Sequence, residues 1–351
     1  MQHQTPKNYG WKAELTAAAD IPAEAIRWLW LYWIARGKLS ILAGAGGCGK
    51  TTLAIFLAAT ISRGGDWPDG SKGEVAGNVV IWSGEDGIAD TIIPRLIAAD
   101  ADLNRVHIIQ GRVDMHGNRQ PFDPALDFPL LHEAVDRIGG ISLLIFDPII
   151  SLIRGDMHRA NEVRQGLQKV VDFAEQHDCA VLGITHLKKG GSQTSVVEQI
   201  IGSQAFTALS RGALVAMKFK DSETRVLVRA KANLSIDSGG IQYFIEPVSL
   251  HDQIEATYIR WGEIIEGSAE AIFDEMDRGG SSKPASALDE ACSLLVEALD
   301  AGPVAIAALQ SLAAEACISW ATVRRAQNRL GIRSCKAGMQ GGWMWELPNK
   351  P

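Results

Sequence analysis

Short apolar runs alternate with longer amphipathic stretches from Lys38 to about Trp261. Runs rich in Val, Ile and Leu are typical of buried strands, and apolar residues three and four positions apart mark one face of a helix. Strands that alternate with helices predict an α/β fold with a mostly parallel sheet and right-handed crossovers. The expected strands are Leu39–Ala43, Val79–Ser83, Val106–Gln110, Leu143–Asp147 and Ala180–Thr185, and the expected helices include Pro129–Gly139 and Asn161–His177.

The pattern changes after Ser210, where strand-like segments follow one another with short turns between them. Consecutive strands joined by short turns pair antiparallel. We therefore expect an antiparallel extension on one edge of the sheet. Its strands are Ala213–Phe219, Arg225–Ala230, Gln242–Glu246 and Ala256–Trp261.

The C-terminal part has a different composition. Residues 267–286 are rich in Gly, Ser and charge, which predicts a linker. Two helices are expected beyond it, Val304–Ala316 and Ser319–Leu330, with Ser319 as the N-cap and a glycine-rich turn after them. The predicted division is an N-terminal extension (1–25), an ATPase domain (26–266), the linker (267–286) and a small helical domain (287–351).

All the charged residues between Ile318 and Lys336 are basic. A helix with three arginines before a glycine-rich turn favours a winged helix-turn-helix that binds duplex DNA. Docking of a protein is the alternative role for this domain. The predicted DNA contacts are Arg324, Arg325 and Arg329.

Composition excludes several classes of protein. The net charge of -7 argues against a protein that coats nucleic acid with its whole surface, but it permits a local basic patch. Five scattered cysteines without a C-x-x-C pair argue against a disulfide framework and a zinc site. The run Trp28–Ala35 is far shorter than the roughly 20 residues that cross a bilayer, and the first twenty residues hold no apolar signal segment. We expect a cytoplasmic protein with no membrane partner.

The segment 44–51 reads Gly-Ala-Gly-Gly-Cys-Gly-Lys-Thr and matches the P-loop pattern G-x-x-x-x-G-K-[ST] at every fixed position. It follows an expected strand and opens an apolar helix, Thr52–Ser62, which is the context that the pattern requires. The glycines let backbone N–H groups surround a β-phosphate, Lys50 neutralises the β and γ oxygens, and the Thr51 hydroxyl is placed to bind Mg²⁺. We expect ATP and Mg²⁺ as ligands, with Gly44, Ala45, Gly46, Gly47, Cys48, Gly49, Lys50, Thr51 and Thr52 at the nucleotide.

Two acidic positions complete the expected site. Asp147 ends the apolar strand and would hold a water of the Mg²⁺ shell, although a helix-capping role before Pro148 is also open. Glu85 follows the strand Val79–Ser83, and such strand ends face the ligand crevice of a parallel sheet. Glu85 is therefore the expected base that orients the attacking water, and Asp86 is the second candidate.

These segments together resemble the RecA-like helicase superfamily, and within it the RepA-type plasmid helicases and their DnaB-like relatives. The resemblance covers roughly residues 26–247 and implies that Glu85 is the catalytic base and His186 the γ-phosphate sensor; a packed core histidine is the alternative for His186. It also implies a cation supplied by a neighbouring subunit. The candidates are Arg211, Arg229 and Lys231, and the sequence does not decide among them.

In a RecA-like ring the loops after the catalytic strands line a central channel. The corresponding segments are Ile153–Arg164 and Leu187–Ser195, and Lys188 and Lys189 in the second are the predicted contacts to single-stranded DNA. Mobile solvated loops are the alternative. The resemblance thus implies a homo-oligomer, a hexameric ring that acts as a replicative DNA helicase of plasmid or phage type. A recombination or repair ATPase and a nucleotide-gated DNA-binding regulator are the alternatives.

Overall fold

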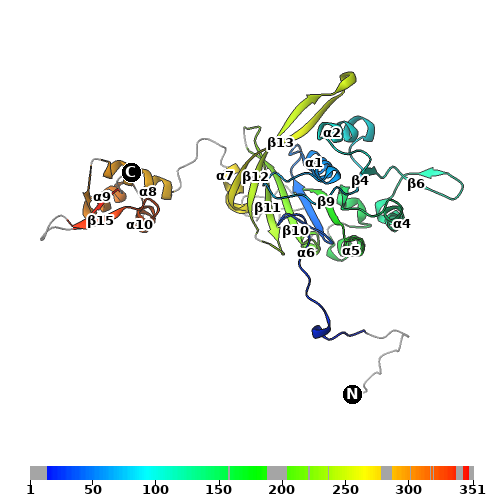
Figure 1. Ribbon diagram of the computed structural model, residues 1–351, viewed down its shortest axis with the longest axis horizontal. Coiled ribbons are helices and arrows are strands. Elements are labelled where there is room, and N and C mark those ends of the chain that lie inside the picture. Colours follow the sequence, from blue (N-terminus) through cyan, green and yellow to red (C-terminus); the bar gives the residue numbers. More distant parts are fainter. Residues whose placement is uncertain are drawn as a thin grey trace, which may run out of the picture. The chain divides into compact units, whose positions relative to one another are not determined.

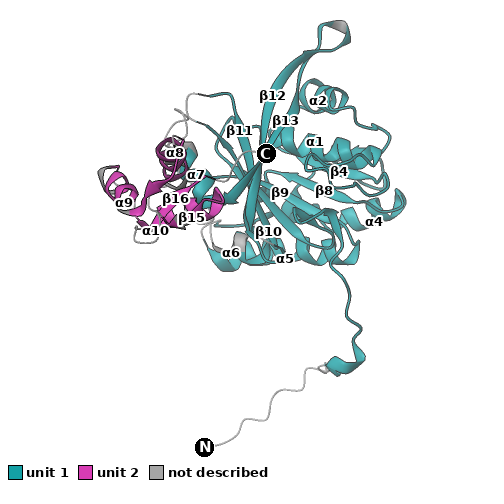
Figure 2. Cartoon of the chain, turned by 60° about the vertical axis from the view of Figure 1, so that its left-hand side comes forward, with its two compact units in different colours: residues 1–279 teal, residues 280–351 magenta. Residues whose placement is uncertain are grey.

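The structure is a computed structural model that describes residues 14–156, 159–187, 204–219, 222–235, 237–277, 287–300, 302–316, 318, 320–336 and 343–347. The chain forms two compact units, Met1–Gly279 and Gly280–Pro351 (Figure 2). The first unit carries the P-loop, and the second carries the arginine-rich helix.

Nine strands of the described residues form one sheet in the first unit, in the order β13-β12-β11-β10-β3-β9-β8-β4-β5 (Figure 1). The strands from β10 to β5 pair parallel, whereas β11, β12 and β13 pair antiparallel. The predicted α/β fold with a large, mostly parallel sheet is therefore confirmed. The strands are β3 (Leu39–Gly44), β4 (Val79–Ser83), β5 (Val106–Ile108), β8 (Leu143–Asp147), β9 (Ala180–His186), β10 (Gly212–Lys218), β11 (Arg225–Ala232), β12 (Ser238–Ser249) and β13 (Glu255–Ser268).

Helices cover both faces of this sheet, which explains why its central strands are apolar without alternation. Ile41 of β3 belongs to one core and Leu42, the next residue, to the other. The first core includes α4, α5, α6 and α7, and the second includes α1 and α2. The helices are α1 (Lys50–Arg63), η2 (Ile88–Ile92), α2 (Ile93–Ala98), α3 (Pro124–Asp127), α4 (Leu130–Arg137), η3 (Ile149–Leu152), α5 (Ala160–Gln176), α6 (Gln204–Leu209) and α7 (Ala269–Asp277).

The tryptophan-rich run before β3 folds into a small hairpin of β1 (Trp28–Trp30) and β2 (Ile34–Ala35). Trp30 is fully buried and stacks on Trp33 and Trp67, with ring centroids 4.6 and 4.9 Å apart. This run therefore belongs to the core of the first unit. No helix of the described residues is long and apolar enough to cross a membrane. The other short elements are η1 (Ala18–Asp20), β6 (Arg112–Val113), β7 (Arg119–Gln120) and η4 (His251–Gln253).

The segment 267–286 differs from the expected linker. Its first residues end β13 and form α7, and Ala269 and Ile272 of α7 are buried in the first core. Because α7 contains four acidic residues, the composition of the segment does not reveal that its apolar residues form a buried face. Residues 278–286 lie outside the described residues.

The described part of the second unit contains α8 (Ala287–Leu299), α9 (Ile306–Glu315) and α10 (Trp320–Arg329). Its antiparallel sheet has the order β14-β16-β15, with β14 (Val304–Ala305), β15 (Arg333–Lys336) and β16 (Trp343–Glu346). Trp345 is fully buried in a separate core with Leu295 and Leu309. The helix expected from Val304 begins two residues later because β14 takes up its start, and the predicted cap Ser319 lies outside the described residues.

Candidate nucleotide-binding site

The P-loop joins the end of β3 to the start of α1. Gly47 and Gly49 have φ angles of 78° and 81°, a region that side chains other than glycine rarely adopt. A Cβ added at Gly46 or Gly47 would meet no described atom within 4 Å, so the space above the loop is open. The loop therefore forms a cradle whose size and backbone donors suit a phosphate group.

Lys50 folds back over this cradle. Its Nζ donates hydrogen bonds to the carbonyls of Gly44 at 3.0 Å and Ala45 at 3.1 Å, and it lies 3.4 Å from Nδ1 of His186. Burial lowers the pKa of Lys50, and the nearby side chains of Cys48, Asp147 and Glu85 act in the opposite direction. An ammonium held by neutral carbonyls remains available to an entering phosphate.

Thr51 and Asp147 meet beside the loop. The Thr51 hydroxyl donates a 2.7 Å hydrogen bond to Oδ2 of Asp147, which is buried at the end of β8. Burial raises the pKa of Asp147; the Thr51 hydrogen bond opposes this, and the neighbouring carboxylates of Glu85 and Asp86 add to it. A hydroxyl and a carboxylate side by side are hard oxygen ligands, so this pair fits Mg²⁺.

Glu85 and His186 face each other across the ends of β4 and β9. Nε2 of His186 lies 3.9 Å from Oε1 of Glu85, and the two side chains are 47% and 53% exposed. The ammonium of Lys50 has donors alone, so Nδ1 of His186 must accept from it and Nε2 must carry the proton that faces Glu85. His186 is thus a half-exposed link between Lys50 and Glu85, unlike a packed core histidine.

Asp86 has a different environment from Glu85. Its Oδ2 forms an ion pair with Nη1 of Arg95 in α2 at 2.7 Å. Its backbone N–H donates a hydrogen bond to the Ser83 hydroxyl. The Asp86 carboxylate is therefore engaged by Arg95. This pairing favours Glu85 as the carboxylate that faces the open space of the site.

Strand β12 supports the P-loop through contacts that the sequence does not reveal. The Tyr243 hydroxyl donates a 2.6 Å hydrogen bond to the backbone carbonyl of Cys48, and the Ile245 side chain packs where a Cβ at Gly49 would lie. Burial raises the pKa of Tyr243, so the phenol stays a donor. The antiparallel extension therefore fixes the far side of the P-loop.

The three cations expected from a neighbouring subunit lie at the end of the strands opposite to the P-loop. The backbone N–H of Arg211 donates to Leu39 at the start of β3, and Arg229 and Lys231 pair with the first residues of β10. From Leu39 to Gly44 the chain makes five steps of about 3.3 Å, or roughly 17 Å. None of these three residues therefore meets the P-loop of its own chain.

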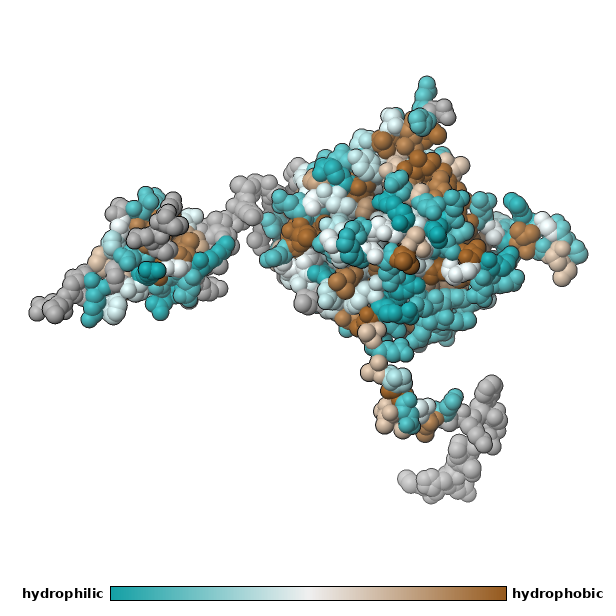
Figure 3. Space-filling view, in the orientation of Figure 1, coloured by the Kyte–Doolittle hydropathy of each residue, from teal (hydrophilic) through white to brown (hydrophobic). Residues whose placement is uncertain are grey.

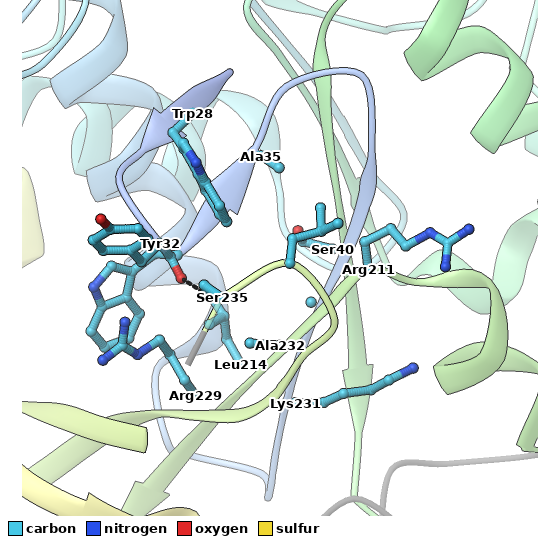
Figure 4. A pocket seen from close by; sticks show the side chains of 13 residues that line it. Trp28, Tyr32, Ala35, Ser40, Arg211, Leu214, Arg229, Lys231, Ala232 and Ser235 are labelled. Atoms are coloured by element: carbon cyan, nitrogen blue, oxygen red, sulfur yellow. Dashed lines mark hydrogen bonds between the residues drawn. The ribbon is translucent and has the colours of Figure 1, made fainter. Parts of the chain in front are cut away.

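These cations line a small pocket with Trp28, Tyr32 and other residues (Figure 4). The Arg229 guanidinium lies 4.8 Å from the centre of the Trp33 ring, and Nζ of Lys231 donates to the Ser210 carbonyl at 3.4 Å. Burial lowers the pKa of both side chains. Arg211 is exposed, and Figure 4 shows it extending away from Trp28 and Tyr32.

The expected DNA contacts are described in part. Lys188 and Lys189 lie outside the described residues, and so does the side chain of Arg325. Arg324 and Arg329 are exposed on α10 of the second unit, and Arg154 is exposed in the loop after η3.

A family model described as "AAA domain" matches residues 5–192, which is more than half of the chain. No curated protein sequence matches the chain. Among solved structures, the crystal structure of the RadB recombinase is similar at 17% sequence identity and a TM-score of 0.43, over 64% of this chain and 91% of that chain.

Proposed function

The chain belongs to the AAA-domain family of P-loop ATPases, and from that premise we propose that it hydrolyses ATP with Mg²⁺ while acting on DNA as a ring-forming, hexameric replicative helicase. One observation carries the ATPase part of the proposal. The cation of the P-loop, the Thr51–Asp147 pair and Glu85 converge on the open space above the loop.

Each of these residues has a defined task in hydrolysis. Lys50 and the backbone of the loop bind and orient the β and γ phosphates. Thr51 and Asp147 would hold Mg²⁺, one through its hydroxyl and the other through a bound water. Bound Mg²⁺ supplies positive charge to the phosphate oxygens that become more negative during the reaction.

Glu85 orients the attacking water and accepts its proton. Its half-exposed carboxylate lies at the carboxyl edge of the sheet, where ligands of parallel sheets bind. His186 contacts Lys50 on one side and faces Glu85 on the other, so a change at the phosphate-binding ammonium reaches the base through one side chain. This arrangement supports the role of His186 as the γ-phosphate sensor.

Arg211 is the residue that we propose as the cation supplied by a neighbouring subunit. Arg229 is held against Trp33 and Lys231 against Ser210, whereas Arg211 extends from the edge of the sheet into solvent. Cations that reach a transferring phosphoryl group from a neighbouring chain contribute roughly 10³–10⁵ in rate. Head-to-tail packing that brings Arg211 to the next P-loop is the geometry of rings and of open filaments.

The second unit is proposed as a winged helix that binds duplex DNA. Its described elements alternate three helices with a small antiparallel sheet, and α10 carries the exposed arginines Arg324 and Arg329. We also propose that Lys188 and Lys189 contact single-stranded DNA in the channel.

A strand-displacement assay with forked DNA tests the helicase part of the proposal. ATP-dependent separation of the strands by the wild-type chain, with rings on DNA in electron micrographs, is the expected result. ATP-dependent filaments without strand separation would instead assign the chain to recombination or repair, and DNA binding without turnover would assign it to nucleotide-gated regulation.

A further inference from the structure

The second unit separates its charges along the sequence. Residues 287–315, which include α8 and α9, carry five acids and no base, whereas residues 318–336, which include α10 and β15, carry five bases and no acid. In the view of Figure 3, most of the described surface of this unit is hydrophilic. A concentration of positive charge on a polar surface suits the phosphates of a nucleic acid.

Trp343 is an exposed aromatic residue beside this basic stretch. It is the first residue of β16 and pairs with Lys336, the last residue of β15 (Figure 2). Trp343 is 55% exposed, whereas Trp345, on the same face of β16, is fully buried and stacks on Trp320. The described core of this unit includes Trp345 and does not include Trp343. Packing within the described core therefore does not explain the Trp343 ring.

Two cations accompany this ring. Nζ of Lys336 lies 5.7 Å from the centre of the Trp343 ring. The side-chain amide of Gln327 in α10 donates to the Ser334 hydroxyl at 3.5 Å, so this side of α10 lies against β15. Arg324 is three residues before Gln327, which places it on the neighbouring turn of the same side of the helix, and it is exposed.

An exposed ring with cations nearby suits an unpaired nucleotide. Aromatic side chains bind single-stranded nucleic acid by stacking on its bases, and cations beside them bind its phosphates. A base inside a duplex must first leave the stack before a protein ring can cover its face, which costs a few kcal/mol. The ring therefore favours a base that is already unpaired. A protein partner could also cover the ring, but five bases without an acid favour a polyanion.

We propose that Trp343 and Lys336 form a binding site for an unpaired nucleotide at the end of a duplex, an inference that rests on the proposed DNA binding of the second unit. Trp343 stacks on the base, and the Lys336 ammonium binds the adjacent phosphate. Arg324 binds the backbone of the adjoining duplex. The second unit thus prefers junctions between single and double strands, which are the DNA that a helicase acts on.

Two DNAs test this site: a blunt duplex, and the same duplex with a short unpaired end that carries a fluorescent adenine analogue. Fluorescence anisotropy with the full chain, without ATP, measures both affinities. The wild-type chain should bind the unpaired end more tightly and quench the analogue by stacking. Trp343→Ala should lose that quenching and about tenfold in affinity for the unpaired end, with its affinity for the blunt duplex unchanged. Trp343→Phe keeps a ring and should lose less.

The charge and the control are tested with the same DNAs. Lys336→Ala should lower the salt dependence of binding to the unpaired end by about one phosphate contact. Leu312→Ala is the matched control, because Leu312 in α9 is also an exposed apolar residue of this unit, in its acidic part. It should bind both DNAs like the wild type.

Equal losses of affinity for the two DNAs in Trp343→Ala would show a structural role and overturn the site. Unchanged affinity of this variant for the unpaired end, an analogue that the wild type does not quench, or a wild-type chain that binds neither DNA overturns it as well. Affinity is measured without ATP turnover or strand separation. A chain that prefers the unpaired end through Trp343 but separates no strands therefore keeps this site and loses the proposed helicase function, and a helicase without this preference does the reverse.

Discussion

The phenol of Tyr243 donates a 2.6 Å hydrogen bond to the carbonyl of Cys48, which joins the antiparallel extension of the sheet to the middle of the P-loop. The two residues are 195 positions apart in the sequence. Both are buried, so this bond is shielded from water. The shape of the phosphate cradle therefore depends on a strand that contributes nothing to the P-loop motif.

Tyr243→Phe should leave the Cys48 carbonyl without this partner while keeping the packing of the ring. A lost buried hydrogen bond costs on the order of 1 kcal/mol of unfolding free energy, and the loosened loop should bind ATP several-fold more weakly. Urea unfolding and nucleotide titration measure the two effects. Tyr258→Phe is the control, because Tyr258 lies on β13, where it pairs with Glu246, and no described hydrogen bond joins it to the P-loop; equal effects of the two substitutions would show that Tyr243 has no special role.

Glu85→Gln and Asp86→Asn should separate the base from its neighbour. Glu85→Gln should retain ATP affinity and lose about 100-fold or more in turnover, because the carboxylate accepts a proton from water and does not bind phosphate. Asp86→Asn should weaken the ion pair with Arg95 and keep most of the turnover. Steady-state ATPase assays and nucleotide-binding measurements on both variants distinguish the two residues. Loss of turnover in Asp86→Asn, with turnover kept in Glu85→Gln, would make Asp86 the base.

Histidine protonation should make the first unit less stable in acid. Nε2 of His177 lies 2.9 Å from Nδ1 of His132, and burial, together with that neighbouring ring, lowers the pKa of His177. The unfolded chain then binds the proton more readily than the folded chain, so stability falls as pH decreases from the ordinary pKa of 6.5 toward the lowered value.

Urea unfolding at pH 8 and pH 5 should show this loss in the wild-type chain and a smaller one in His177→Gln. His116→Gln serves as the control because His116 is exposed in a turn between β6 and β7. An identical pH dependence in wild type and His177→Gln would contradict the assignment.

Arg211→Ala subunits should reduce the activity of wild-type subunits in mixtures. The variant keeps its own Lys50, Asp147 and Glu85, yet it fails to supply charge to the γ-phosphate of its neighbour. Turnover should fall by roughly 10³ in the pure variant, and limited activity should return when it is mixed with Lys50→Ala, since some interfaces then join an intact P-loop to an intact Arg211.

The same mixing with Arg229→Ala and Lys231→Ala provides the comparison. These two side chains are held by Trp33 and Ser210, so their loss should act mainly on the stability of the pocket. If activity returns when Lys50→Ala is mixed with Arg229→Ala or Lys231→Ala, and not with Arg211→Ala, that residue is the cation supplied to the neighbouring subunit.

Local motifs made much of the geometry of the candidate site predictable. The P-loop, Asp147 and Glu85 each stand at the end of a strand whose apolar run is visible in the sequence, and parallel strands bring their carboxyl ends to one edge. The bond from Tyr243 was not predictable, because the register of β12 depends on contacts between distant segments. Helix α7 was missed because its acidic residues outnumber the apolar residues that pack into the core.

Steady-state ATP hydrolysis by the full chain, with and without single-stranded DNA and beside the Lys50→Ala variant, tests the central claim most directly. Lys50 is the cation that folds over the P-loop, so no other described side chain of the loop replaces it. The wild-type chain should hydrolyse ATP in a Mg²⁺-dependent reaction that DNA accelerates, and Lys50→Ala should be inactive. Turnover in Lys50→Ala close to that of the wild type would contradict the assignment of the site.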